Sequence, residues 1–149
     1  MLAVHLVAAE PIEFPALWTM RRDVMRPIWR TISPDYEEQE ECHEWFRSSV
    51  SFPGTSWIEY AGARVGTITI TPHPQYVHVQ HLVILEGFQG RGIGQIVMRD
   101  VLKEAHAARR DVRLSVHTTN VRTLSFYQRL GFQITGIEGD ETLLTSSHL

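Results

Sequence analysis

The sequence has few features of a secreted, membrane or disulfide-stabilised protein. Its 149 residues include a single cysteine, Cys42, so an internal disulfide is excluded. No apolar run approaches the roughly 20 residues that span a bilayer, and Met1–Leu6 lacks the basic segment and cleavage site of a signal peptide. We therefore expect a soluble, cytoplasmic protein with no membrane partner.

A strong positive charge is also missing. The formal net charge is −3 with histidines neutral, and the basic residues are dispersed, so a nucleic acid would bind against the overall field. We expect no nucleic-acid partner. Long repeats and low-complexity segments are absent too. A chain of 149 residues with 43% hydrophobic content can bury one core, which predicts a single domain over residues 1–149.

The sequence also lacks histidine, cysteine and carboxylate residues at the short spacings typical of a metal site. His73, His78 and His81 have no cysteine or carboxylate at matching short spacing. On a strand, His78 and His81 would point to opposite faces, because side chains alternate with a period of two. We expect no metal site.

The most informative segment present is Gln89-Gly90-Arg91-Gly92-Ile93-Gly94, which follows an apolar strand and opens an amphipathic helix. Free N–H groups at the positive end of a helix dipole can bind a phosphate. A dinucleotide fingerprint would require glycine at position 95, which is Gln95, and a Walker loop would end in Gly-Lys-Ser/Thr. The remaining pattern, Gln-x-x-Gly-x-Gly, resembles the pyrophosphate loop of the GNAT superfamily of N-acetyltransferases, which use acetyl-CoA.

A second segment, from Asn120 to Phe132, resembles the other GNAT signature, Asn-x-x-Ala/Thr-x-x-Phe-Tyr-x-x-x-Gly-Phe. Its residues also predict a helix independently. Asn120 is a suitable N-cap and Gly131 a suitable C-cap, and apolar residues recur between them at helical spacing, namely Leu124, Tyr127 and Leu130. The resemblance covers roughly residues 55–146.

The resemblance implies an α/β (mixed α+β) GNAT fold, with a central, mostly antiparallel mixed sheet of about seven strands flanked by about four helices. Strands are expected at Val4–Ala8, Trp57–Tyr60, Arg64–Thr71, Tyr76–Leu85, Val112–His117, Phe132–Thr135 and Glu141–Thr145. Helices are expected from Pro15 to about Met25, and over Tyr36–Ser48, Gly92–Ala108 and Asn120–Leu130. Pro27 and Pro34 are expected to interrupt any longer helix. The apolar run Leu82–Leu85 predicts complete burial there, and Ile96 is expected on the buried face of its helix.

The resemblance also assigns residues to the cosubstrate acetyl-CoA. The main chain of Leu82, Val83 and Ile84 would hold the pantetheine arm, with the Ile84 N–H polarising the acetyl carbonyl. The pyrophosphate would lie over the loop and the first turn that follows it, made of Gln89, Gly90, Arg91, Gly92, Ile93, Gly94 and Gln95. Asn120 and Tyr127 would contact the same molecule.

Two side chains are predicted to be catalytic. Tyr127, with an ordinary pKa of about 10, can protonate a thiolate whose conjugate acid has a pKa of about 8.5. His78 is the candidate base that takes a proton from the amine, since its ordinary pKa is about 6.5. His81, Glu86 and Glu59 are rivals for this role, and so is a chain of water molecules.

The function implied by the resemblance is transfer of an acetyl group from acetyl-CoA to a primary amine of a small molecule or peptide by direct attack. The protein would then be an N-acetyltransferase, a member of the acyltransferases. The alternative is a catalytically silent module that binds CoA or acyl-CoA for regulation, and a homodimer through the C-terminal strands is left open. The acidic residues between Asp35 and Glu44 either attract a cationic amine or form a solvated helix face.

Overall fold

A computed structural model describes residues 3–149 and consists of two compact units. Unit 1 comprises Met1–Thr69, of which residues 3–69 are described, and His81–Gly94. Unit 2 comprises Ile70–Gln80 and Gln95–Leu149. The prediction of a single domain over residues 1–149 stays a prediction.

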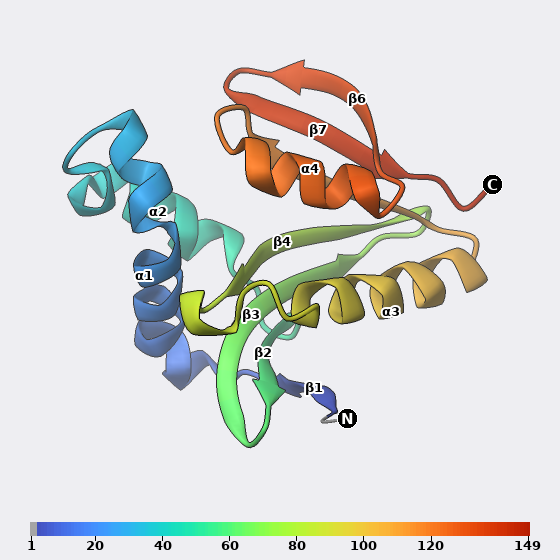
Figure 1. Cartoon of the computed structure of the whole chain (residues 1–149), viewed down its shortest axis with the longest axis horizontal. Helices are drawn as coiled ribbons and strands as arrows, with labels where there is room; N and C mark the ends of the chain where they lie inside the picture. Colours follow the sequence, from blue (N-terminus) through green and yellow to red (C-terminus); the bar gives the residue numbers. More distant parts are fainter. Residues whose placement is uncertain (1–2) are drawn as a thin grey trace. The chain divides into compact units, whose positions relative to one another are not determined.

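The predicted fold class is confirmed: seven strands form one mixed, mostly antiparallel sheet in the order β1-β2-β3-β4-β5-β7-β6, accompanied by four α-helices (Figure 1). The strands are β1 (Val4–Ala8), β2 (Thr55–Tyr60), β3 (Ala63–Pro72), β4 (Tyr76–Ile84), β5 (Asp111–His117), β6 (Gln133–Glu138) and β7 (Glu141–Ser146). The helices are α1 (Phe14–Ile32), α2 (Glu40–Ser49), α3 (Ile93–Ala107) and α4 (Val121–Arg129), with short 3-10 turns η1 (Pro11–Glu13), η2 (Tyr36–Glu38) and η3 (Glu86–Phe88). No helix of residues 3–149 is long and apolar enough to span a bilayer.

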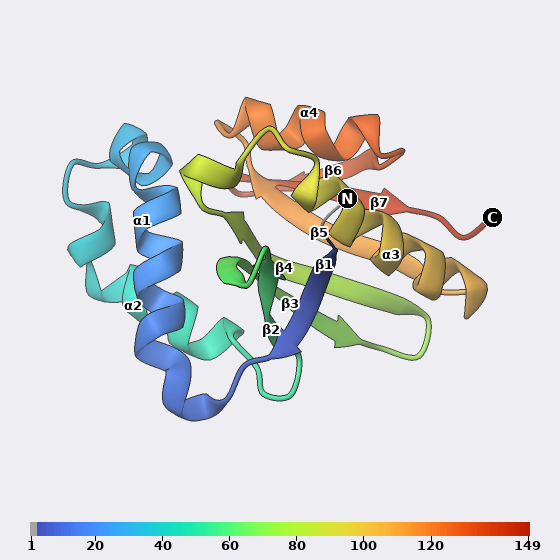
Figure 2. The ribbon, with the colours of Figure 1, turned by 60° about the horizontal axis from the view of Figure 1, so that its bottom comes forward.

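Unit 1 contains the antiparallel pairs β1–β2 and β2–β3. A tight hairpin turn joins β2 to β3, with φ of 54° at Ala61 and 78° at Gly62, as a turn between twisted strands requires. Helix α2 lies beside α1, where the rings of Trp18 and Phe46 are 5.3 Å apart (Figure 2). A core cluster around Phe46 and Trp57, each 2% exposed, joins these helices to the strands.

Helix α1 is longer than predicted, because it continues past Pro27 to Ile32 and ends before Pro34. A proline inside a helix removes one backbone hydrogen bond. Tertiary contacts stabilise the turn beyond it: Trp29 is 5% exposed, and Arg26 and Arg30 both bind Glu37 in η2, at 3.0 and 3.1 Å. The predicted second helix is divided into η2 and α2.

The last residues of β4 lie very close to β3 within unit 1. A Cβ added at Gly66 would overlap the main-chain oxygen of Val83 and would come within 2.9 Å of Ile84 Cδ1. Glycine at position 66 therefore permits a strand contact that a side chain would prevent.

Unit 2 contains the parallel pair β4–β5 and the antiparallel pairs β5–β7 and β6–β7. Strand β5 alternates strictly: Val112, Leu114 and Val116 are buried, whereas Arg113 and Ser115 are exposed. One face of β5 is thus apolar, and the other carries polar side chains.

Two predictions of burial were wrong. In the run Leu82–Leu85, Val83 is buried but its neighbours are half-buried, because the strand keeps its alternation to its end. In α3, Ile96 is 41% exposed and Met98 is fully buried instead, because Met98 lies at helical spacing from the buried residues Val101 and Ala105 and shares their face.

Candidate functional site

The glycine-rich loop in unit 1 has an open surface and positive φ angles at two glycines. Gly90 and Gly92 have φ of 77° and 81°, values that residues with a side chain adopt rarely. Nothing lies within 4 Å of a Cβ built at either glycine, so the loop surface is open. Helix α3 starts at Ile93, directly after the loop, and the buried Ile93 side chain, 2% exposed, anchors this helix start. Successive N–H groups with this geometry favour an anion.

The same loop is tied to the end of β4. The Gln89 side chain donates a hydrogen bond of 2.7 Å from Nε2 to the main-chain oxygen of Ile84. The Leu85 N–H donates to the Val65 oxygen at 2.8 Å, which holds the strand end against β3. A hydrogen bond therefore connects the predicted phosphate loop directly to the strand segment Leu82–Ile84, whose main chain is predicted to contact the cosubstrate. Both lie in unit 1.

Arg91 adds a positive charge to this loop. Its guanidinium carbon lies 5.1 Å from the centre of the Phe88 ring, and its side chain is exposed. Of the other two predicted contacts, Gly94 lies in the first turn of α3 in unit 1, and Gln95 follows it as the first residue of the second segment of unit 2.

His81, the rival base, lies in unit 1 and has a structural environment. Its side chain is 7% exposed, its backbone φ is 57°, and its Nε2 lies 2.9 Å from Ser49 Oγ in α2. The rings of Trp45 and Phe46 pack 5.0 and 5.3 Å from its own ring. These contacts connect α2 to β4.

Tyr127 and Asn120 belong to unit 2. Asn120 is the N-cap of α4, as predicted: its side chain accepts a hydrogen bond of 3.4 Å from the Thr123 N–H. Tyr127 is 5% exposed, and its ring lies edge-on to Phe126 and Phe132 at 5.1 and 5.4 Å. The aromatic contacts fix the ring, and Gly131, with φ of 98°, lets the chain turn after the helix as predicted.

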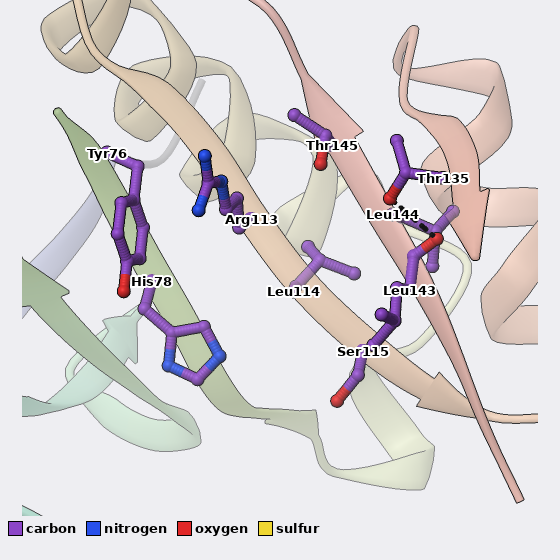
Figure 3. Close-up of a pocket in the computed structure, with 9 residues that line it drawn as sticks. All are labelled: Tyr76, His78, Arg113, Leu114, Ser115, Thr135, Leu143, Leu144 and Thr145. Atoms are coloured by element: carbon purple, nitrogen blue, oxygen red, sulfur yellow. Dashed lines mark hydrogen bonds between the residues drawn. The ribbon is translucent and has the colours of Figure 1, made fainter. Parts of the chain in front are cut away.

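His78 lies in a pocket of unit 2, between strands β4, β5, β6 and β7 (Figure 3). The pocket has a volume of about 560 Å³, which suits a small molecule. Figure 3 shows that its side chains come from all four strands. The lining residues are Tyr76, His78, Arg113, Leu114, Ser115, Thr135, Leu143, Leu144 and Thr145.

The pairing of β4 with β5 ends at this pocket. Within unit 2, the parallel ladder joins Tyr76–His78 to Asp111–Arg113 and does not continue to Val79 and Gln80. His78 and Arg113 are the last residues paired before the strands separate.

His78 has a perturbed acidity. Burial of its imidazole, together with the nearby His73, lowers the pKa of His78 below its ordinary value of 6.5. Burial disfavours the charged form of the ring. The imidazole is therefore mostly neutral at pH 7, which is the form that accepts a proton.

Three of the acidic residues between Asp35 and Glu44 form ion pairs or hydrogen bonds within unit 1. Glu37 is buried and binds Arg26 and Arg30, and Glu44 binds Arg47. Asp35 accepts hydrogen bonds from Ser33 Oγ and Gln39 Nε2. Arginines thus pair with two of these six acidic residues, Glu37 and Glu44, which favours the interpretation of a partly self-paired, solvated segment.

Sequence reasoning missed most of the pocket. Arg113, Ser115, Thr135 and Thr145 lie on three different strands, and no motif marks them. The alternation of polar and apolar residues over Asp111–His117 was a usable signal, because it shows that one face of β5 is not covered by core. Residues 3–149 contain no group of three or more His, Cys, Asp or Glu side chains arranged to hold a metal ion.

Comparison with known proteins identifies the family. The family model described as "Acetyltransferase (GNAT) family" matches residues 15–132. An uncharacterized N-acetyltransferase of Bacillus subtilis (strain 168) is 26% identical over 114 residues, which are 74% of this chain and 64% of that protein. The matched part is thus less than two thirds of that relative. A probable N-acetyltransferase of Mycobacterium tuberculosis is 28% identical over 144 residues, 89% of this chain and 82% of that protein.

The fold is shared with solved structures. The PaiA N-acetyltransferase from Thermoplasma acidophilum, in complex with coenzyme A, superposes with a TM-score of 0.74 at 16% identity, over 97% of this chain and 99% of that chain. The family model matches well over half of the residues of the present chain. The protein therefore belongs to the acetyltransferase (GNAT) family.

Proposed function

We propose that the protein is an acetyl-CoA-dependent N-acetyltransferase that moves an acetyl group to a primary amine of a small molecule or peptide by direct attack. Family membership supports acetyl transfer, and the glycine-rich loop is the observation that carries the proposal for this chain. At Gly90 and Gly92 the open space where a Cβ would stand lets a pyrophosphate approach the main chain. The cytoplasmic location and the homodimer stay predictions.

Unit 1 would bind the cosubstrate. The N–H groups of Gly90 to Gly94 would hold the pyrophosphate, with charge added by Arg91, and Leu82 to Ile84 would hold the pantetheine arm. When bound, acetyl-CoA supplies an activated acetyl group as a thioester. The Ile84 N–H would donate a hydrogen bond to the acetyl oxygen and stabilise the negative charge that develops there.

Unit 2 would move the protons. An alkylamine is mostly ammonium at pH 7, and only its neutral form attacks, so His78 would take a proton at its imidazole nitrogen. Tyr127 would donate its hydroxyl proton to the sulfur as the carbon–sulfur bond breaks, which leaves CoA as a thiol, and the tyrosinate would regain a proton from the nitrogen as the amide forms. Asn120 would cap α4 and contact the cosubstrate.

The test is titration of the purified protein with acetyl-CoA, followed by a thiol-release assay over a panel of amines. Saturable binding with thiol release for one class of amine supports the proposal. Binding without release by any amine of the panel contradicts catalysis and supports a silent binding module. No binding contradicts the assignment of the loop.

A matched pair of glycine variants tests the loop itself. Gly92→Ala and Gly139→Ala both place a Cβ at a positive φ, 81° and 62°, with nothing within 4 Å, so they carry similar backbone strain. Only Gly92→Ala is expected to weaken acetyl-CoA binding, because Gly139 lies in the β6–β7 turn. Equal affinities of the two variants would contradict the assignment.

A further inference from the structure

The pocket of unit 2 has an unusual charge balance. Among its nine lining residues, Arg113 has the only permanent charge, and no aspartate or glutamate is present. The lowered pKa of His78 leaves that ring mostly neutral at pH 7. The pocket therefore presents one positive charge to any molecule that enters it.

Tyr76 positions the Arg113 guanidinium. The guanidinium carbon lies 4.2 Å from the centre of the Tyr76 ring, and the His73 ring is stacked on the same tyrosine at 4.4 Å. Figure 3 shows the Tyr76 and Arg113 side chains next to each other on the adjacent strands β4 and β5. A guanidinium stacked on an aromatic face keeps its N–H edge available for an acceptor.

Arg113 forms no direct ion pair. Among residues 3–149 no carboxylate lies within ion-pair distance of its guanidinium, although the Arg113 charge helps to lower the pKa of Asp111. Asp111, two residues earlier on the same face of β5, accepts instead from the N–H and Nδ1 of His148, at 3.0 and 2.8 Å. A guanidinium in a pocket without a carboxylate favours an anionic ligand.

We infer that this pocket recognises an acceptor that carries a carboxylate close to its amine, as a free amino acid does, and that Arg113 pairs with this carboxylate. The inference rests on the proposed function and names the class of acceptor. One cation matches a monoanion, whereas a phosphate monoester carries nearly two negative charges at pH 7. The bidentate geometry of a guanidinium also fits a carboxylate.

The distance between the two proposed contacts fits such a molecule. His78 and Arg113 are directly paired across β4 and β5, and neighbouring strands lie about 4.8 Å apart. An amine at the His78 imidazole and an anion at the Arg113 guanidinium are thus separated by only a few bonds. An α-amino acid has this spacing, but the chain terminus of a peptide acceptor has an amide where the carboxylate would be.

The rest of the lining suits the remainder of an amino acid. The hydroxyls of Ser115 and Thr145 can bond to carboxylate oxygens that Arg113 leaves open, and Leu143 offers an apolar contact for a side chain. The Thr135 hydroxyl is 3.4 Å from the Leu143 oxygen and donates to it. The volume of about 560 Å³ leaves room for the whole molecule.

The experiment compares free L-amino acids with their carboxamides as acceptors, with thiol release as the readout of kcat/KM. Wild-type protein, Arg113→Gln, Arg113→Lys and the control Lys103→Gln are assayed. Lys103→Gln also removes one positive charge, from an exposed position of α3 outside the pocket. Binding of N-acetyl-L-amino acids, the products of the proposed reaction, is measured in parallel by calorimetry, which does not require turnover.

The expected result is a preference of at least about tenfold for the acid over its amide, lost in Arg113→Gln, partly kept in Arg113→Lys and unchanged in Lys103→Gln. Equal rates with acids and amides, or a preference that survives Arg113→Gln, would overturn the inference and leave the proposed function intact. If the protein neither binds acetyl-CoA nor releases thiol with any amine, the proposed function fails. Calorimetry alone then decides: binding of the N-acetyl-amino acid that depends on Arg113 supports the carboxylate site, and its absence refutes it.

Discussion

Replacing Gly66 with alanine tests the close contact between β3 and β4 in unit 1. The added Cβ would overlap the main-chain oxygen of Val83 and would stand 2.9 Å from Ile84 Cδ1. The Ile84 methyl can move, but the Val83 oxygen belongs to the backbone of a strand whose end is held by the hydrogen bond from the Leu85 N–H to the Val65 oxygen. The substitution therefore forces the two strands apart.

The expected loss in the free energy of unfolding follows from two opposing effects. Overpacking of this kind costs about 1–3 kcal/mol. Replacing glycine restricts the unfolded chain and returns about 0.5–1 kcal/mol. We expect Gly66→Ala to lower the free energy of unfolding by about 1–2 kcal/mol, which for a chain of this size lowers Tm by about 3–6 °C.

The assay is urea unfolding followed by circular dichroism and tryptophan fluorescence, which should give coincident transitions. Gly87→Ala is the matched control, because nothing lies within 4 Å of its added Cβ and its φ is not positive. That variant should stay within about 0.5 kcal/mol of wild type. A Gly66→Ala protein as stable as Gly87→Ala would refute the reasoning about the strand contact.

Three further predictions concern the proposed machinery. Tyr127→Phe keeps the ring contacts with its aromatic neighbours but removes the hydroxyl. Turnover should therefore fall at least about tenfold, while the acetyl-CoA affinity measured by calorimetry changes little. Unchanged turnover would exclude Tyr127 as the acid. His78 must be neutral to accept a proton, and its pKa is lowered, so kcat/KM of the wild type should fall only as the pH drops through a value below 6.5. His78→Gln should lower the rate and should lack this decrease at acidic pH. An identical pH profile for both proteins would exclude His78 as the base. Asn120→Ala removes the side chain that accepts a long hydrogen bond, 3.4 Å, from the Thr123 N–H. In urea titrations it should lower the free energy of unfolding by about 0.5–1 kcal/mol. A stability equal to wild type would show that the cap contributes nothing.

Local patterns predicted the elements that local interactions decide. The strand from Val112 to His117 and the N-cap at Asn120 depend on neighbours a few residues away, and the structure has both as expected. The two family motifs likewise specify backbone conformations, because a loop with φ near 80° at two positions needs glycine at both. For these features the sequence alone was sufficient.

Helix α1 shows where local rules fail. Pro27 predicts a helix end, yet the helix continues, because contacts of Trp29 with the core and of Arg26 and Arg30 with Glu37 stabilise the turn beyond the proline. Glu37 lies outside the helix, and Trp29 contributes through burial. A rule based on proline alone considers neither contribution. The same ion pairs with Arg26 and Arg30 also explain why an acidic residue is buried at position 37.

By itself, then, the sequence determined the family, the order of the helices and strands, the glycine-rich loop and the capped helix that carries Tyr127. Only the tertiary structure decided the neighbours of His78: it pairs this residue with Arg113, stacks Arg113 on Tyr76, and adds hydroxyls from two further strands. The physical reason is the range of the interactions. Backbone conformations are set by adjacent residues, whereas the charge and shape of a pocket arise from side chains that chain topology brings together from segments tens of residues apart.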